Sequence, residues 1–193
     1  GREWDLAAEI QRSILPAPRP EPFPLVGVNL PARGVSGDFY DWLERSDGSI
    51  AFCVADVSGK GMNAAILMAK TASLFRCIAR DGHPPGALLG RLNDEILETV
   101  TGGMFVTMAA GVLDASHERV RLANAGHPPA LFRDRHGGYR EIPSGGPPLG
   151  IAPLAETGGD PPEVELSLAG GSLYLFTDGL TESPAGGGGP LGS

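Results

Sequence analysis

The sequence predicts an α+β fold in which sheets pack face to face and helices lie outside them. Two long central helices are expected at 62–80 and 85–100, and runs of strand character occur both before and after them. Strands and helices that occupy separate parts of a chain in this way are typical of α+β domains. The chain has 193 residues, of which 41% are hydrophobic, so one domain with a sizeable core is expected.

An amphipathic helix is expected near the beginning of the chain, over residues 3–15. Leu6, Ile10 and Ile14 recur at i, i+4 spacing and therefore lie in one row on a helix. The helix must end where prolines begin to alternate with other residues, over 16–24, because proline fixes an extended backbone and lacks an N–H group. Two interpretations remain open: a helix that lies on the domain, or the end of a connector from an upstream domain.

The two central helices differ in their patterns. Residues 62–80 are apolar on most sides, which suits a helix that is sandwiched under other elements. The second helix carries an apolar row at i, i+4 spacing, made of Leu88, Leu92, Ile96 and Val100. Between the helices, the glycine and prolines of the segment at 81–85 break the helical pattern.

Strands are predicted wherever short apolar or alternating runs are bounded by turn residues. The runs occupy 25–33, 38–44, 50–57, 104–113, 120–125, 130–133, 139–142, 163–168 and 172–177. Residues 144–162 are rich in glycine and proline and are expected to form a loop.

Composition excludes several classes of function. The net charge of −8 argues against binding of nucleic acid or an anionic membrane, because both require clustered Lys and Arg. No apolar run approaches the ~18 residues that suggest a membrane span, and no signal-peptide pattern opens the chain. Cys53 and Cys77 lie in apolar segments without CxxC spacing. They are interpreted as buried thiols in a reducing cytosol, so a cytoplasmic location is expected.

The segment VADVSGKG at 54–61 combines the end of a strand, an aspartate and a Gly-Lys pair. A phosphate-binding P-loop requires Gly-x-x-x-x-Gly-Lys-Ser/Thr. Here the first glycine position is Val54, and Gly61 follows Lys60 where a hydroxyl is needed. A P-loop nucleotide hydrolase is therefore disfavoured, and Asp56 is the better candidate for chemistry.

Aspartates lie beside glycine at strand edges in three segments. These are SGDFYD with Asp38 and Asp41, VADVSGKG with Asp56, and FTDG with Asp178. Glycine lets the backbone turn tightly there, so a carboxylate and a main-chain carbonyl can face one ion. Converging carboxylates repel one another, and a divalent cation relieves that repulsion. Ligation by oxygen alone favours Mg²⁺ or Mn²⁺ over Zn²⁺, whereas an ordinary turn is the alternative for each single segment.

Six sequence blocks make the chain recognisable. They are GDFYD at 37–41, DVSGKG at 56–61, MFVTM at 104–108, NAGHPP at 124–129, PLG at 148–150 and TDGLTE at 177–182. In these blocks the chain resembles bacterial serine phosphatases of the SpoIIE/RsbU type, a branch of the metal-dependent type 2C protein phosphatases (PPM superfamily). The resemblance runs from about residue 10 to residue 182. Any single block is unspecific, but six in the same order are very specific.

The resemblance implies a four-layer α-β-β-α sandwich with a two-metal centre, holding Mn²⁺ or Mg²⁺, between two antiparallel sheets. Asp38 and Asp56 would bind or bridge the metals. The main-chain carbonyl of Val57 would hold one ion, and Asp178 would hold the other. Two ions about 3.5–4 Å apart share a water molecule, lower its pKa and orient it for in-line attack on phosphorus.

Three further residues of these blocks are given roles. His127 could donate a proton to the leaving serine oxygen or bind phosphate, and a histidine that is merely hydrogen-bonded in a loop is the alternative. Asp41 is three residues from Asp38, so the two face opposite sides of a strand. Asp41 is therefore expected to support the site from outside it or to have a purely structural role. Lys60 is assigned to the surface or the substrate, not to the metals.

The resemblance also implies a substrate and a domain context. The expected substrate is phosphoserine on a STAS-type anti-sigma-factor antagonist in a partner-switching pathway, and an attached sensor or receiver domain is the expected regulator. Residues 1–15 are interpreted as a connector helix, through which a homodimer could form, and 16–183 as the phosphatase domain. Residues 184–193 are a Gly-rich tail that resembles an engineered remnant.

Two departures from the family pattern leave an alternative open. Ser36 stands where the family usually has a glycine, and the chain lacks the later helix, strand and acidic residue that complete the second metal site. A truncated domain is therefore expected, whose second ion binds weakly or not at all. The alternative function is a catalytically impaired phosphatase-fold module that acts as a protein-interaction scaffold. Mn²⁺-dependent hydrolysis of p-nitrophenyl phosphate distinguishes the two.

Overall fold

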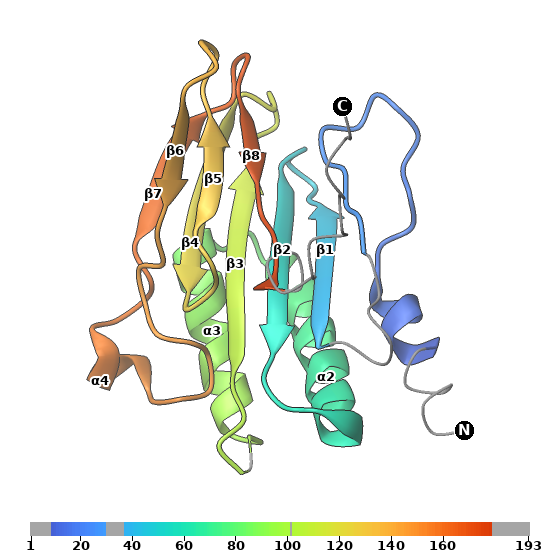
Figure 1. Ribbon diagram of the computed structural model, residues 1–193, viewed down its shortest axis with the longest axis vertical. Coiled ribbons are helices and arrows are strands. Elements are labelled where there is room, and N and C mark those ends of the chain that lie inside the picture. The colour runs from blue at the N-terminus through green and yellow to red at the C-terminus, as the bar shows by residue number, and fades with distance from the viewer. Residues whose placement is uncertain (1–8, 30–36, 101, 179–193) are drawn as a thin grey trace, which may run out of the picture.

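Two antiparallel sheets and two long helices make up the computed structural model, which describes residues 9–29, 37–100 and 102–178 (Figure 1). The larger sheet has the order β1-β2-β3-β4-β7. Its strands are β1 (Asp38–Glu44), β2 (Ile50–Val57), β3 (Val106–Leu113), β4 (Arg119–Ala125) and β7 (Glu163–Ser167). The smaller sheet has the order β6-β5-β8, from β5 (Ala130–Arg133), β6 (Tyr139–Ile142) and β8 (Ser172–Tyr174).

Helices α2 (Gly61–Ala79) and α3 (Pro85–Leu97) cover one face of the larger sheet (Figure 1). Helix α2 packs on β1 and β2, and α3 packs on β3 and β4. Helix α3 begins with a proline, which is favoured in the first turn because its missing N–H would have no helical partner there. A single-turn helix, α4 (Leu154–Thr157), lies in the predicted loop, and residues 9–14 are also helical.

Two apolar cores lie on opposite faces of the larger sheet. Alternate residues of β2 face opposite sides, as strand geometry requires. Ala51, Cys53 and Ala55 join the core between sheet and helices, whereas Ile50 and Phe52 join the core between the two sheets. The larger sheet is therefore buried on both faces, which explains why β2 and β3 read as nearly continuous apolar runs.

Arg45, in the turn after β1, connects this sheet to the end of α2. Its guanidinium donates from Nε to the carbonyl oxygen of Ala79 at 2.7 Å and from Nη2 to that of His83 at 2.8 Å. Carbonyl groups at a helix C-terminus lack helical partners, and a cation there also complements the helix dipole. The contact ties the β1–β2 hairpin to α2 at the end of β1 that is remote from Asp38.

The predicted α+β class with two antiparallel sheets and flanking helices is confirmed. Within the described part of the chain, both long helices lie on the same side, so three layers of the expected sandwich are seen (Figure 1). None of the described helices is long and apolar enough to cross a membrane.

Two expectations are wrong. Residues 25–29 form no strand, although they fall within the predicted strand at 25–33, of which 30–33 lie outside the described residues. Val26 and Val28 are 88% and 72% exposed, so this segment lacks the packed neighbours that its composition suggested. Cys77 is exposed, because it lies on the outer surface of α2, whereas Cys53 is buried as expected.

Candidate metal centre

Asp38 and Asp56 lie directly opposite each other in the β1–β2 ladder. Residues that are directly opposite in an antiparallel pair project from the same face of the sheet. Asp56 shares the face of Phe52, which packs between the two sheets, because the two residues are separated by an even number of positions. Both carboxylates therefore face the second sheet, at the end where β1 begins and β2 ends.

The main chain approaches closely at this end of the hairpin. A Cβ atom at Gly37 would overlap the carbonyl oxygen of Val57 and would lie 3.2 Å from Oδ1 of Asp56. Only glycine avoids that overlap, so the glycine before Asp38 is required by packing. The carbonyl oxygen of Gly37 also accepts a hydrogen bond from the N–H of Val57 at 3.2 Å. Gly37 thus lets the Val57 carbonyl oxygen and the Asp56 carboxylate lie close to the start of β1.

Asp41 faces away from the pocket, as predicted, and forms an ion pair with Arg76 of α2. Nε and Nη2 of Arg76 donate to the two carboxylate oxygens at 2.7 and 2.8 Å, and the N–H of Trp42 donates to Oδ1 at 2.8 Å. Burial raises the pKa of Asp41, while the hydrogen bonds and charge of Arg76 act in the opposite direction. This contact holds β1 against α2 from the side opposite Asp38.

His127 links β3 to the segment after β8 through its two ring nitrogens. Nε2 lies 3.0 Å from the carbonyl oxygen of Phe176, and Nδ1 lies 3.0 Å from the hydroxyl of Thr107. Because a carbonyl oxygen can only accept, Nε2 carries the proton, and neutral Nδ1 accepts from Thr107. Burial lowers the pKa of His127, although the Phe176 hydrogen bond and the charges of Asp178 and Asp38 oppose that shift. His127 is therefore a neutral, buried side chain.

Asn124 shapes the loop that carries His127. Its Oδ1 accepts from the N–H of His127 at 2.8 Å, and its Nδ2 donates to the carbonyl oxygens of His127 and Pro128 at 3.1 and 3.2 Å. Gly126 has a φ of +68°, which glycine adopts without strain. A Cβ there would also lie 2.6 Å from the ring of Pro148, so the NAGHPP and PLG blocks pack on each other.

The segment after β8 reaches the pair of carboxylates. The hydroxyl of Thr177 donates to Oδ2 of Asp38 at 3.0 Å, across 139 residues of sequence. Asp178 follows directly and is exposed, and its charge acts on His127 together with that of Asp38. In the described residues, no three His, Cys, Asp or Glu side chains are grouped so that they could hold an ion. The centre therefore consists of the Asp38–Asp56 pair, with Asp178 nearby.

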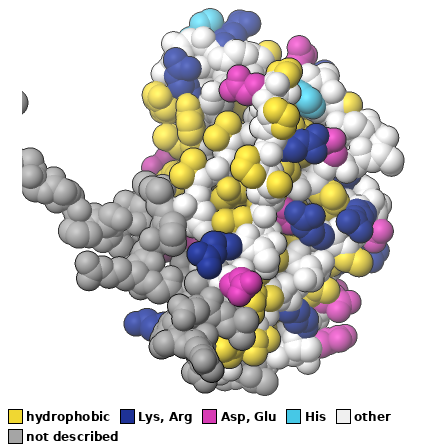
Figure 2. All heavy atoms as spheres, turned by 90° about the vertical axis from the view of Figure 1, so that its right-hand side faces the viewer, with side chains coloured by type: hydrophobic (Ala, Val, Ile, Leu, Met, Phe, Trp, Pro, Cys, Tyr) yellow, Lys and Arg dark blue, Asp and Glu magenta, His cyan; other side chains and the backbone are white. Residues whose placement is uncertain are grey.

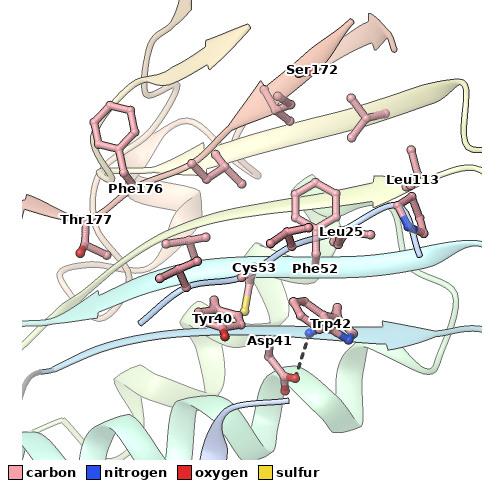
Figure 3. Close-up of a pocket in the computed structure, with 18 of the residues that line it drawn as sticks. Leu25, Tyr40, Asp41, Trp42, Phe52, Cys53, Leu113, Ser172, Phe176 and Thr177 are labelled. Carbon is pink, nitrogen blue, oxygen red and sulfur yellow. Dashed lines mark hydrogen bonds between the residues drawn. The ribbon is translucent and has the colours of Figure 1, made fainter. Parts of the chain in front are cut away.

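A cavity of about 340 Å³ opens between the sheets and reaches this centre at Asp38 and Thr177. Figure 3 shows Tyr40 and Trp42 on the cavity side of β1, Phe52 between the sheets, and Asp41 turned towards the helices. On the side of the molecule next to β1, apolar side chains run over the middle of the surface between charged ones (Figure 2). The cavity is lined chiefly by apolar and aromatic side chains, and its polar end carries Asp38.

The donors present fit a hard divalent cation. Two carboxylates on one face and a main-chain carbonyl provide only oxygen ligands, the set that Mg²⁺ and Mn²⁺ prefer.

Lys60 is exposed at the N-cap of α2. The sequence predicted Asp38, Asp56 and Val57 as metal ligands, but it did not single out Thr107 or Thr177. The sequence feature that could have pointed to Thr107 is its place in the MFVTM block, and for Thr177 it is its place in the TDGLTE block.

Residues 46–193 match the family described as Stage II sporulation protein E (SpoIIE). The chain belongs to the SpoIIE family. This SpoIIE-family chain is also 30% identical over 210 residues to Protein IcfG of Synechocystis sp. (strain ATCC 27184 / PCC 6803 / Kazusa), covering 94% of the chain and 33% of that protein. It is 28% identical over 183 residues to phosphoserine phosphatase RsbU of Bacillus subtilis (strain 168), covering 93% of the chain and 53% of RsbU. It thus spans about half the length of these curated relatives or less.

Solved structures agree with this membership. The RsbU and RsbW domains of Rv1364c from Mycobacterium tuberculosis align with a TM-score of 0.66 and 30% identity, over 81% of this chain and 42% of that one. The SiaA-PP2C domain of Pseudomonas aeruginosa aligns with a TM-score of 0.72 and 22% identity, over 98% and 76% of the two chains. The SpoIIE-type PP2C fold expected from the six sequence blocks is confirmed.

Proposed function

We propose that this chain is a metal-dependent protein serine/threonine phosphatase that uses Mn²⁺ or Mg²⁺ to hydrolyse phosphoserine. The observation that carries the proposal is the paired placement of Asp38 and Asp56 beside the Val57 carbonyl. Family membership, the name phosphoserine phosphatase of RsbU and the PP2C fold support the same activity.

The residues of the centre have distinct tasks in this proposal. Asp38, Asp56 and the Val57 carbonyl would hold the metal, and Asp178 would contribute to a second ion. When bound, the metal would supply a water molecule of lowered pKa as the nucleophile at neutral pH. Thr177 fixes the orientation of Asp38 by donating to its Oδ2. The two carboxylates stay close together because the strand ladder positions their main chains.

His127 was given the role of a proton donor or phosphate ligand, and that role stays a prediction. Its burial and its two hydrogen bonds favour the alternative of a histidine held within the loop. In that case it acts by holding the main chain at Phe176, two residues before Asp178.

The proposal also names a substrate protein and a regulatory domain. A phosphorylated STAS-type anti-sigma-factor antagonist is the proposed substrate, and a sensor or receiver domain joined through the N-terminal helix is the proposed regulator. The relatives named above are longer than this chain, which supports attachment of further domains in proteins of this family. A homodimer through the N-terminal helix stays a prediction.

The deciding experiment is hydrolysis of p-nitrophenyl phosphate by the unmodified chain and by Asp56→Asn, with Mn²⁺ varied. The unmodified chain is expected to require Mn²⁺, and Asp56→Asn is expected to lose turnover while its circular dichroism spectrum and thermal unfolding are retained. A folded variant with near-normal turnover removes Asp56 from the mechanism. The scaffold alternative is supported if the unmodified chain folds and binds a phosphorylated STAS protein but hydrolyses neither that protein nor p-nitrophenyl phosphate.

A further inference from the structure

Gln11, in the helical segment at 9–14, is a buried polar side chain next to the candidate metal centre. It is 4% exposed, and its amide Nε2 donates to the main-chain carbonyl oxygen of Asp38 at 3.2 Å. The contact joins residues that are 27 positions apart, and its acceptor belongs to a residue assigned to the metal. Most glutamine side chains lie in solvent, so a buried glutamine is unusual. The long-range hydrogen bond to the Asp38 carbonyl is therefore a specific feature of the packing.

The place of Asp38 in the sheet explains why such a contact matters. Asp38 is the first residue of β1, and β1 is an edge strand of the five-stranded sheet. On one side the β2 ladder holds the strand, and no described strand pairs with its other side. The amide of Gln11, in the helical segment at 9–14, donates a hydrogen bond to the main chain of Asp38, the residue at which the β1–β2 ladder begins.

The amide is itself held in place by the packing of its helix. Ile14 and Leu15 pack against the core between the larger sheet and the helices. Arg12 and Ser13, on the same segment, are exposed, and the hydroxyl of Ser13 donates to the carbonyl oxygen of Ile10 within that segment. The packing of Ile14 and Leu15 therefore helps to fix the position from which Gln11 reaches Asp38.

We propose that Gln11 is a positioning residue of the metal centre, which fixes the main chain of Asp38 so that its carboxylate stays opposite Asp56. The inference rests on the proposed function, because it needs Asp38 to be a metal ligand. The carboxylate of Asp38 is held at its tip by Thr177, and its main chain is held by β2 and Gln11. Partners that orient metal ligands typically change metal affinity about 10–100-fold when they are removed.

The test uses Gln11→Met in the full 193-residue chain, because methionine keeps the length and apolar volume but has no N–H donor. Ser13→Ala is the matched control, since it removes an exposed polar group from the same segment. Mn²⁺ affinity is measured by titration calorimetry, below the onset of thermal unfolding of each variant. Gln11→Met is expected to raise the Kd for Mn²⁺ about 10-fold, and Ser13→Ala is expected to leave it unchanged.

Each outcome decides the matter. A folded Gln11→Met variant with unchanged Mn²⁺ affinity overturns the inference. Gln11→Asn, whose shorter amide falls short of Asp38, is measured in parallel, and failure of both variants to fold would assign Gln11 to general stability instead. Asp38→Asn separates this inference from the proposed function. Mn²⁺ binding that survives Asp38→Asn contradicts the metal centre, whereas its loss together with unchanged binding in Gln11→Met contradicts only the role of Gln11.

Discussion

Replacing Gly37 by alanine is expected to damage the metal centre more than the fold. The new Cβ would overlap the Val57 carbonyl oxygen, which belongs to the main chain and cannot rotate aside. The same two residues are joined by the hydrogen bond from the N–H of Val57 to the carbonyl oxygen of Gly37. Relief of the overlap therefore requires β1 and β2 to separate at the position of the two carboxylates.

The expected loss of stability comes from overpacking, and the expected loss of turnover comes from displacement of the metal ligands. Overpacking of a tight site costs about 1–3 kcal/mol of unfolding free energy, which corresponds to a decrease in Tm of about 2–4 °C per kcal/mol for a chain of this size. A shift of about 1 Å at a reacting centre lowers turnover about 100-fold. Activity is therefore expected to fall much further than stability.

The assay combines urea unfolding, Mn²⁺ titration calorimetry and hydrolysis of p-nitrophenyl phosphate. Gly146→Ala is the control, because a Cβ at Gly146 meets its nearest neighbour, Cγ of Pro161, at an ordinary 3.5 Å. The control is expected to leave stability and turnover close to those of the unmodified chain. If Gly37→Ala binds Mn²⁺ and turns over substrate like the control, then the close approach of Gly37 and Val57 has no part in shaping the site.

The remaining predictions concern buried polar groups and thiols. Arg76→Ala leaves the Asp41 carboxylate buried without its cationic partner. Breaking a fully buried ion pair costs about 3–5 kcal/mol, but the Arg76 side chain is 42% exposed, so the loss of unfolding free energy is expected to be smaller, about 2 kcal/mol at pH 7. That loss is expected to shrink as the pH falls, because burial raises the pKa of Asp41 and a protonated carboxyl group needs no cationic partner. Urea unfolding at decreasing pH measures it. Because burial lowers the pKa of His127, stability is expected to fall as the pH drops through about 6.5, where the unfolded histidine gains a proton. His127→Gln should flatten that part of the stability profile, and an unchanged slope would show that other groups cause it. Ellman's reagent is expected to label the exposed Cys77 rapidly. It is expected to label Cys53 only in urea, because Cys53 is buried and burial raises the pKa of its thiol. Rapid labelling of two thiols in the native chain would contradict the burial of Cys53.

Local pattern was sufficient to predict the elements that build the site. The apolar run that ends at Asp56 and the run that begins at Asp38 became β2 and β1 with the expected bounds, and the helix after Lys60 became α2. Each of these elements is specified by neighbours in sequence, through strand alternation or helical spacing. The same reasoning assigned Asp41 to the side of β1 away from the pocket.

Contacts between distant segments could not be derived in the same way. The bond from Thr177 to Asp38 and the bond from Gln11 to the Asp38 carbonyl depend on how whole elements pack. The apolar residues at 25–29 look like a strand in sequence but lack a ladder partner in the fold. Exposure of Cys77 likewise depends on which face of α2 meets the sheet.

The β1–β2 hairpin also bears on the order in which this domain acquires its structure. Asp38 and Asp56 meet within a short, local hairpin, whereas Thr177 reaches Asp38 only across 139 residues. Local pairings close with little entropy cost, and a ribosome releases the hairpin long before the segment after β8 exists. The nascent chain therefore brings two negative charges together early, and a cation that binds at that stage would favour the hairpin before the rest of the domain has folded.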